Sequence, residues 1–126
     1  MGDISKNFNR SEFTCKCGEC DDDTVDTELV KIYQGIRDHF AKPVRITSGC
    51  RCSKHNASVG GAVNSQHKKG RAGDGQISGV SPYEISLYVE NKYLSDHGGI
   101  GLYDTFIHID TRTQKARWDK RTDQAV

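Results

Sequence analysis

The sequence lacks the features that would place it in a membrane or on a nucleic acid. No hydrophobic run approaches the roughly 20 residues that a membrane-spanning helix needs. Residues 1–7 lack the apolar segment of a secretory signal, so we expect the chain to stay in the cytoplasm where it is made unless something else exports it. Its 18 basic and 17 acidic side chains nearly cancel, so nothing in the charge indicates nucleic acid or an anionic membrane as partner.

The chain also lacks the length for two hydrophobic cores. With 126 residues, 34% of them hydrophobic and 28% charged, it suits one soluble globular domain over residues 1–126. We expect an irregular, cysteine-containing segment over residues 1–23. The tail over residues 114–126 is charged, and we expect it to pack only in part and to fray at its end.

Cysteine is present in an odd number and in two clusters. The five residues are Cys15, Cys17, Cys20, Cys50 and Cys52. A chain that is not exported normally keeps its thiols reduced. Four thiolates at such short spacings are a common closed zinc site, and Cys15, Cys17, Cys20 and Cys52 are the candidate ligands of a structural zinc. The alternative is a set of thiols that bind no metal.

Two segments have helical patterns. Apolar residues recur at helical spacing from residue 24 to residue 40, before Pro43. A second helix begins at Ser81-Pro82-Tyr83-Glu84, where Ser81 is the N-cap, Pro82 the first helical residue and Glu84 the partner in a capping box. We expect the pair Gly98-Gly99 to end that element. Short strands are predicted over residues 44–47, 74–78, 100–103 and 106–112.

The most informative stretch is residues 65–74, which carries His67 and Asp74. Its glycines disfavour a helix, so we expect a loop with His67 that turns into a strand with Asp74. A nitrogen and a carboxylate oxygen suit zinc, and a third ligand is available in His108. Side chains alternate along a strand, so Phe106, His108 and Asp110 share one face. Three protein ligands and one open position would make a catalytic zinc site. The alternative for each histidine is a buried ring that only satisfies a backbone carbonyl.

Arg51 follows the predicted strand at residues 44–47. Beside a metal, its guanidinium would hold a substrate carboxylate or stabilise a developing oxyanion. For a single arginine, the alternative is an exposed salt bridge.

Several of these stretches together resemble peptidase family M15, the zinc D-Ala-D-Ala carboxypeptidases, and most of all its compact subgroup common in bacteriophages and prophages. The resemblance covers about residues 8–112. It is carried by residues 13–18, 46–52, 55–57, 59–62, 64–74, 99–103 and 106–110. The Ser-x-His-x-x-Gly-x-Ala-x-Asp signature over residues 65–74, followed by a later histidine, is quite specific.

The resemblance implies His67, Asp74 and His108 as zinc ligands and a water on the zinc as the nucleophile. It implies that Arg51 orients the substrate or its oxyanion and that Ser65 supports the site by hydrogen bonding. The implied fold is α+β, a small antiparallel sheet that holds the metal with helices on its other side, as in the signalling domain of hedgehog proteins. The implied substrate is the stem peptide of bacterial peptidoglycan.

Two departures from the family pattern concern the general base and the packing of one strand. Many relatives place a histidine two residues, or a glutamate three residues, before the last zinc histidine. Those positions are Phe106 and Thr105 here, so Asp110 and Asp104 are the remaining candidates for the base. Asp110 could instead orient a metal ligand. Relatives also carry an apolar residue at the position of Gly75, and we expect the glycine to loosen packing there.

The main hypothesis is therefore a zinc metallopeptidase that cleaves an amide bond in cell-wall peptides. A carboxypeptidase and an endolysin-like endopeptidase fit equally well. We expect it to act on the bacterial cell wall, as a phage lysis protein or as part of the virion. The rival hypothesis is a non-catalytic module that keeps the zinc, lacks the base, and binds the cell wall or a protein partner.

Overall fold

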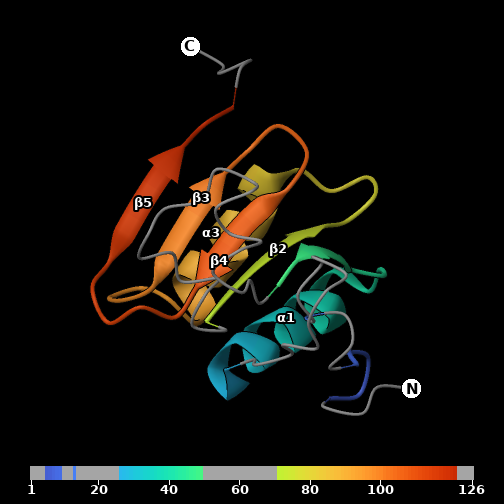
Figure 1. Cartoon of the computed structure of the whole chain (residues 1–126). Coiled ribbons are helices and arrows are strands. Elements are labelled where there is room, and N and C mark those ends of the chain that lie inside the picture. The colour runs from blue at the N-terminus through green and yellow to red at the C-terminus, as the bar shows by residue number, and fades with distance from the viewer. Residues whose placement is uncertain (1–4, 10–12, 14–25, 50–70, 122–126) are drawn as a thin grey trace, which may run out of the picture.

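The computed structural model describes residues 5–9, 13, 26–49 and 71–121 (Figure 1). These residues form two helices and five strands, which confirms the predicted α+β class. In chain order the elements are α1 (Thr27–Phe40), β1 (Arg45–Ser48), β2 (Ala72–Gln76), α3 (Pro82–Lys92), β3 (Gly99–Leu102), β4 (Ile107–Asp110) and β5 (Ala116–Asp119). Among them no helix is long and apolar enough to cross a membrane.

The strands form one sheet in the order β1-β2-β4-β3-β5. Neighbouring strands are antiparallel, as predicted, except that β5 runs parallel to β3, so the sheet is mixed. Strand β5 lies within the segment that the sequence assigned to a frayed tail. Its four residues, Ala-Arg-Trp-Asp, alternate apolar and charged side chains, but the run is too short and too charged to predict a strand from the sequence. The edge of β3 provides the ladder instead, with Ala116 N donating to Gly98 O and Lys120 N to Leu102 O.

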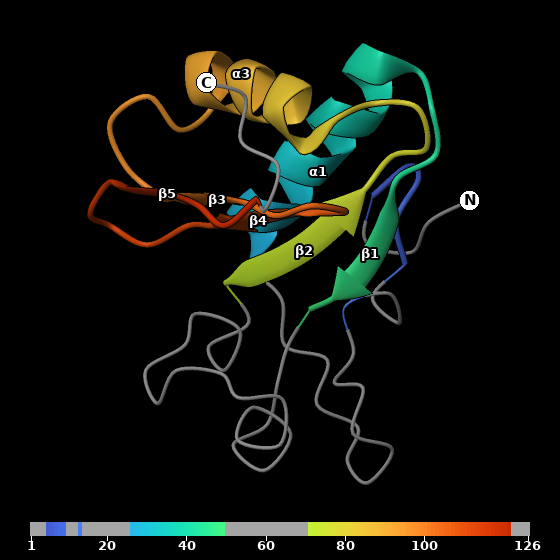
Figure 2. The same ribbon diagram turned by 90° about the horizontal axis from the view of Figure 1, so that it is seen from above.

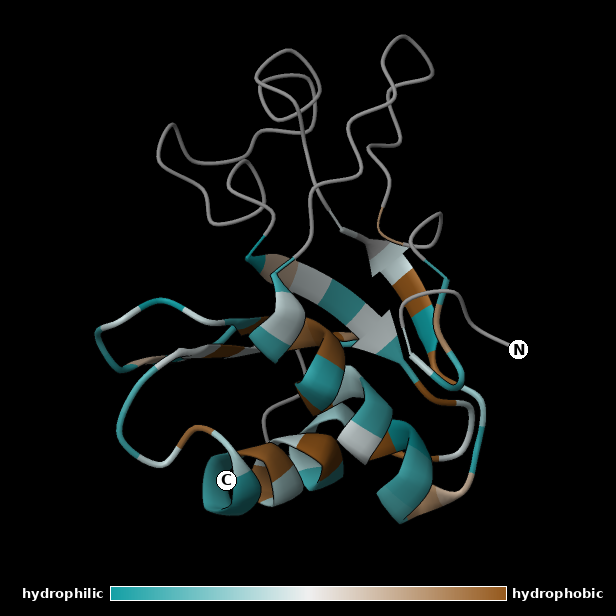
Figure 3. Ribbon diagram, turned by 90° about the horizontal axis from the view of Figure 1, so that it is seen from below, coloured by the Kyte–Doolittle hydropathy of each residue, from teal (hydrophilic) through white to brown (hydrophobic). Residues whose placement is uncertain are grey.

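Both helices cover the same face of the sheet, and the core fills the space between them and the strands (Figure 2). In each helix hydrophobic and hydrophilic residues are interspersed along the ribbon (Figure 3). The buried side chains recur at helical spacing and meet the inward-facing residues of β3 and β4. The buried residues from the helices and the strands include Leu29, Ile32, Tyr33, Ile36, Ile85, Val89, Ile100, Ile107 and Ile109. Each such burial stabilises the fold by about 1.5–3 kcal/mol.

Helix α3 begins as the sequence predicts and ends earlier. The Ser81 hydroxyl accepts a hydrogen bond from Glu84 N at 3.2 Å, which confirms the N-cap. The helix ends at Lys92 rather than reaching Gly98-Gly99. Beyond it, both Tyr93 N and Leu94 N donate to Val89 O, and the fully buried Leu94 turns into the core. The chain thus leaves the helix after Lys92 and buries Leu94, where the sequence predicts further helical residues.

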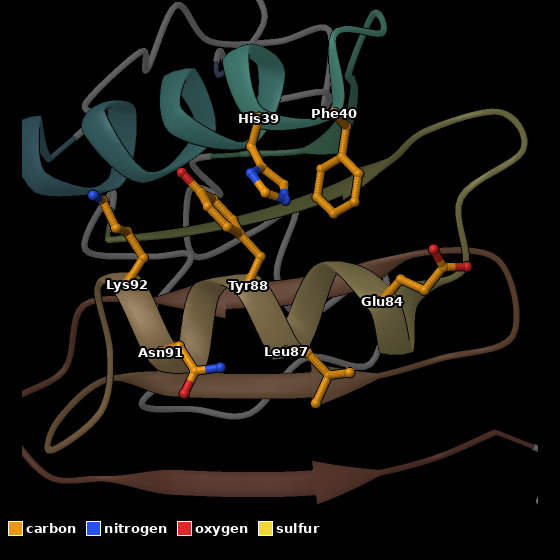
Figure 4. Close-up of a pocket in the computed structure, with 7 residues that line it drawn as sticks. All are labelled: His39, Phe40, Glu84, Leu87, Tyr88, Asn91 and Lys92. Carbon is orange, nitrogen blue, oxygen red and sulfur yellow. The ribbon is translucent and has the colours of Figure 1, made fainter.

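A groove of about 530 Å³ runs between the two helices (Figure 4). The rings of His39 and Tyr88 stack in it with centroids 4.1 Å apart, and Phe40 meets the edge of Tyr88. Because α1 and α3 line this groove, it lies on the helical side of the sheet. Asp74 and His108, two of the predicted metal ligands, point to the other side.

Candidate metal and catalytic site

Asp74 and His108 are brought together by the register of two central strands. Asp74 on β2 is the direct partner of His108 on β4 in the antiparallel ladder. Directly opposite residues in such a ladder have Cβ atoms about 4.5–5.5 Å apart. The side chains meet with Asp74 Oδ1 3.0 Å from His108 Nδ1, and only 5% and 8% of the two residues is exposed. Two residues 34 positions apart in the sequence thus form one buried polar pair.

The pair points away from the helices because of the alternation along β2. Gly73 and Gly75 face helix α1, where Tyr33 packs on them and donates a hydrogen bond to Gly73 O at 2.6 Å. Asp74 between them therefore projects from the opposite face. Burial, and then the Asp74 charge, raise the pKa of Tyr33 well above its usual value, so its hydroxyl stays protonated as the donor.

The two facing atoms are of the kinds, and at about the separation, that one zinc ion requires. Zinc lies about 2.0–2.2 Å from a histidine nitrogen or a carboxylate oxygen. In a tetrahedral site two such ligands are therefore about 3.3 Å apart. Asp74 Oδ1 and His108 Nδ1, 3.0 Å apart, need only a small outward shift to share one ion. The pair can therefore supply two ligands to a divalent cation.

Asp110 binds the other nitrogen of His108. Its Oδ2 lies 2.7 Å from His108 Nε2, across the two-residue step that puts both side chains on one face. Asp110 is fully buried, and its Oδ1 accepts hydrogen bonds from Gly99 N, Arg112 N and Arg112 Nε at 2.8–3.1 Å. Arg112 Nη2 also donates to Oδ2 at 2.7 Å. Both oxygens of Asp110 are thus held by donors, and the carboxylate fixes the His108 ring.

The charges in this cluster shift the pKa values of its groups. Burial alone would raise the pKa of the Asp110 carboxyl, but hydrogen bonds from His108 and Arg112 outweigh it and hold that pKa well below its usual value. Burial alone would lower the pKa of His108, but the bonds to Asp110 and Asp74 raise it. Asp110 therefore stays ionised, and His108 without a metal takes up a proton more readily than a free imidazole.

Three aromatic side chains stand beside the pair. The Trp118 indole lies against the His108 ring with centroids 5.0 Å apart. Its Nε1 donates to Tyr103 Oη at 3.0 Å, and the rings of Tyr103 and Phe106 stack with centroids 4.4 Å apart. The sequence predicts no strand around Trp118, so it gives no sign that this residue lies at the site. The sequence also gives no sign of a role for Arg112, although Arg112 follows Asp110 by two positions, as Asp110 follows His108.

Two glycines on β3 make room for this arrangement. A Cβ at Gly99 would clash with the Asp110 carboxylate, and a Cβ at Gly101 would clash with the Trp118 indole. Gly99 and Gly101 pair with Asp110 and His108 across the ladder. Strand β3 thus presents a surface without side chains, on which the carboxylate and the indole lie.

The remaining predicted site residues fall partly outside the described structure. The positions of His67, Arg51, Ser65 and the five cysteines lie outside the described residues, so their predicted roles stay predictions. Asp104 lies exposed in the turn between β3 and β4. Within residues 5–9, 13, 26–49 and 71–121, no group of three His, Cys, Asp or Glu residues could hold a metal ion. The described part of the chain therefore supplies a pair of ligands.

A family model described as Peptidase M15 matches residues 6–110, which include β2, β3 and β4. No curated protein matches the chain. Because that match spans most of the 126 residues, this chain belongs to peptidase family M15.

Proposed function

We propose that this protein is a zinc-dependent metallopeptidase that hydrolyses an amide bond in the stem peptides of bacterial peptidoglycan. The observation that carries the proposal is the pair formed by Asp74 Oδ1 and His108 Nδ1, with Asp110 holding the far side of the imidazole. Membership of a family of generally zinc-dependent peptidases supports the choice of metal and reaction.

The donor set fits zinc. His67, Asp74 and His108 would hold the ion, which gives two nitrogens and one carboxylate oxygen and leaves a position for water or substrate. Bound zinc supplies Lewis acidity, which polarises the scissile carbonyl and makes water a usable nucleophile near neutral pH. His67 precedes the first residue of β2, Ala72, by five positions, and five extended residues reach about 17 Å. That reach is sufficient for His67 to meet the pair.

Asp110 contributes by orientation. With zinc in place of the proton that Nδ1 shares with Asp74, a carboxylate on His108 Nε2 would keep the other proton on that nitrogen and leave the Nδ1 lone pair for the ion. With both oxygens bonded and a lowered pKa, Asp110 is a poor acceptor for a further proton. Asp104, the other predicted base, is exposed to solvent. We propose that Arg51 and Ser65 bind the substrate, as the family resemblance implies.

Mass spectrometry of muropeptides after incubation with the protein tests this proposal. We expect shortened or unlinked stem peptides, loss of that hydrolysis in excess chelator, and recovery when zinc is restored. His108→Ala should abolish turnover, whereas His97→Ala, the same change at a histidine outside the pair, should retain it. Undiminished hydrolysis in chelator or in His108→Ala would refute the proposal. The masses of the products also identify the bond that is cleaved.

One observation favours a second candidate function, a non-catalytic module that binds the cell wall. Both oxygens of Asp110 are engaged, and Phe106 stands where many relatives carry a basic histidine. If Asp104 also takes no part, the site holds metal without a base. Stoichiometric zinc and binding to cell wall, with no product from any muropeptide, would establish this function. Comparing Asp104→Asn with Asp119→Asn, another aspartate of the described surface, assigns or dismisses Asp104 as the base.

A further inference from the structure

We infer that Trp118 is a positioning residue for the metal ligand His108, and that zinc affinity depends on the indole. This inference rests on the proposed function, because it assigns a role at the same site. The indole and imidazole rings lie 5.0 Å apart at an interplanar angle of 46°. Trp118 comes from β5, the strand at the edge of the sheet, and no predicted ligand lies on that strand.

The His108 ring has two motions that a ligand site must suppress. The hydrogen bond to Asp110 Oδ2 fixes the direction in which Nε2 points. Contacts at the two ring nitrogens lie in the plane of the imidazole, so they leave the ring able to tilt about the line that joins them. The indole face beside the imidazole opposes this tilt, so that Nδ1 stays directed at Asp74 Oδ1. Pre-orientation of a ligand lowers the cost of metal binding.

The indole is itself held by two contacts, and a glycine makes room for it. Trp118 Nε1 donates to Tyr103 Oη at 3.0 Å, and the Tyr103 ring is stacked on Phe106. The Arg112 guanidinium carbon lies 5.4 Å from the centroid of the Trp118 ring, a cation–π contact. Gly101 has no side chain to displace the indole. A side chain held in this way can act as a fixed wall for its neighbour.

Arg112 connects the two groups that restrain His108. It donates to both oxygens of Asp110 and lies over Trp118. Three residues after His108 therefore act on its ring together. The Asp110 carboxylate binds the ring edge, the Trp118 indole limits its tilt, and the Arg112 guanidinium contacts both the carboxylate and the indole.

The test is the zinc affinity of folded variants, measured by competition with a chromogenic chelator. The relevant zinc is the component that disappears in Asp74→Asn, which separates it from any zinc on the cysteines. We expect Trp118→Leu to weaken this binding about 10-fold, the lower end of the range for lost partners of metal ligands. Trp118→Phe keeps an aromatic face and should restore part of the loss. Tyr83→Phe, at an exposed tyrosine on α3, should bind zinc as the wild type does.

Tyr103→Phe keeps the inference falsifiable if the Trp118 variants fail to fold. It removes one hydroxyl and retains the ring stacked on Phe106, and we expect a loss of zinc affinity of about 3-fold because the indole loses its anchor. Unchanged affinity in folded Trp118→Leu, or in Tyr103→Phe where the tryptophan variants do not fold, would overturn the role of Trp118 and leave the proposed function intact. A wild-type protein that binds no zinc at the Asp74-dependent site would overturn both.

Discussion

Tyr33 fills the space that two glycines leave on the helical side of strand β2. A Cβ at Gly75 would lie 2.8 Å from Tyr33 Cε1, and one at Gly73 would lie 3.1 Å from Tyr33 Cε2. The expectation that Gly75 loosens packing is therefore wrong, because a buried aromatic ring occupies the place of the missing side chain. The close approach of Tyr33 also explains how α1 fixes the backbone on both sides of Asp74.

This packing predicts that Gly75→Ala destabilises the fold more than Gly73→Ala. Both changes relieve the same glycine entropy in a strand, worth about 0.5–1 kcal/mol. Only Gly75→Ala places its methyl group at a distance that real Cβ contacts essentially never show, with an overpacking cost of about 1–3 kcal/mol. Urea unfolding of both variants measures the difference. Equal stabilities would show that Tyr33 moves aside without cost.

The sequence predicts single residues well where a spacing is tied to one geometry. Asp110 follows His108 by two positions, so a strand must put both on one face, and the contact at 2.7 Å confirms that prediction. No spacing in the sequence predicts the contact between His108 and Trp118 in this way. It depends on a parallel pairing of β5 with β3, and no local pattern around residue 118 indicates that pairing.

Among the elements, helix α3 owes its start to a side-chain cap that can be tested alone. The Ser81 hydroxyl accepts from Glu84 N, whereas the Ser86 hydroxyl on the same helix donates to Tyr83 O at 2.6 Å. We expect Ser81→Ala to cost about 1 kcal/mol of unfolding free energy, because an N-terminal amide loses its partner. Ser86→Ala should change stability by less than about 0.5 kcal/mol. Thermal unfolding compares them, and equal losses would contradict the capping role.

A histidine links helix α1 to the loop between α3 and β3. His97 Nδ1 lies 2.9 Å from Asp96 Oδ1, and His97 Nε2 lies 2.8 Å from Glu28 Oε2 in the first turn of α1. The bonds to Asp96 and then Glu28 raise the pKa of His97 above its usual 6.5. Arg71 lines the same hollow beside Glu28 and His97.

The raised pKa predicts a stability contribution that depends on pH. Because folding raises the pKa of His97, its contribution is complete below the unfolded value of about 6.5 and is lost as pH rises through the higher folded value. His97→Gln should therefore lower the unfolding free energy at pH 5.5 more than at pH 8.5. Urea unfolding at both pH values measures this, and the subtraction removes the contributions of other groups. A deficit that is the same at both pH values would rule out the charged link.

The prediction of the two helices rests mostly on local sequence patterns. The helical spacing of Leu29, Ile32 and Ile36 predicts α1 within a few residues, and the cap at Ser81 predicts the start of α3. The early end of α3 at Lys92 was missed because it depends on the burial of Leu94. Burial of a side chain against distant strands cannot be predicted from neighbours in the sequence.

On the scale of the whole molecule, the candidate site joins parts of the chain that are far apart. Asp74 lies on β2 and His108 on β4, while Trp118 lies beyond β3 on the far edge of the sheet. Within the residues that the structure describes, β2 and β4 are joined at the site by the strand ladder and by the contact between Asp74 and His108. A metal ion shared by Asp74 and His108 would thus act as a cross-link between β2 and β4 that exists only in the folded state.

Such a cross-link predicts that zinc raises the thermal stability of the protein. An ion that binds only the native state adds about 2.7 kcal/mol at a free concentration 100 times its Kd. For a chain of this size that corresponds to a rise in Tm of roughly 10 °C, reversed by chelator. Calorimetric scans in zinc and in chelator measure it. The matched variants are Asp74→Asn, which loses a carboxylate ligand, and Asp119→Asn, which loses an aspartate of β5.

The two variants separate the candidate site from the predicted cysteine site. Any zinc held by Cys15, Cys17, Cys20 and Cys52 stabilises both variants equally, because neither change touches a thiol. The part of the shift that Asp119→Asn keeps and Asp74→Asn loses therefore belongs to the pair of β2 and β4. We expect this part to be the larger, because zinc on that pair links two central strands of the sheet. The same shift in both variants would mean that Asp74 binds no metal, and the proposed catalytic site would then be refuted.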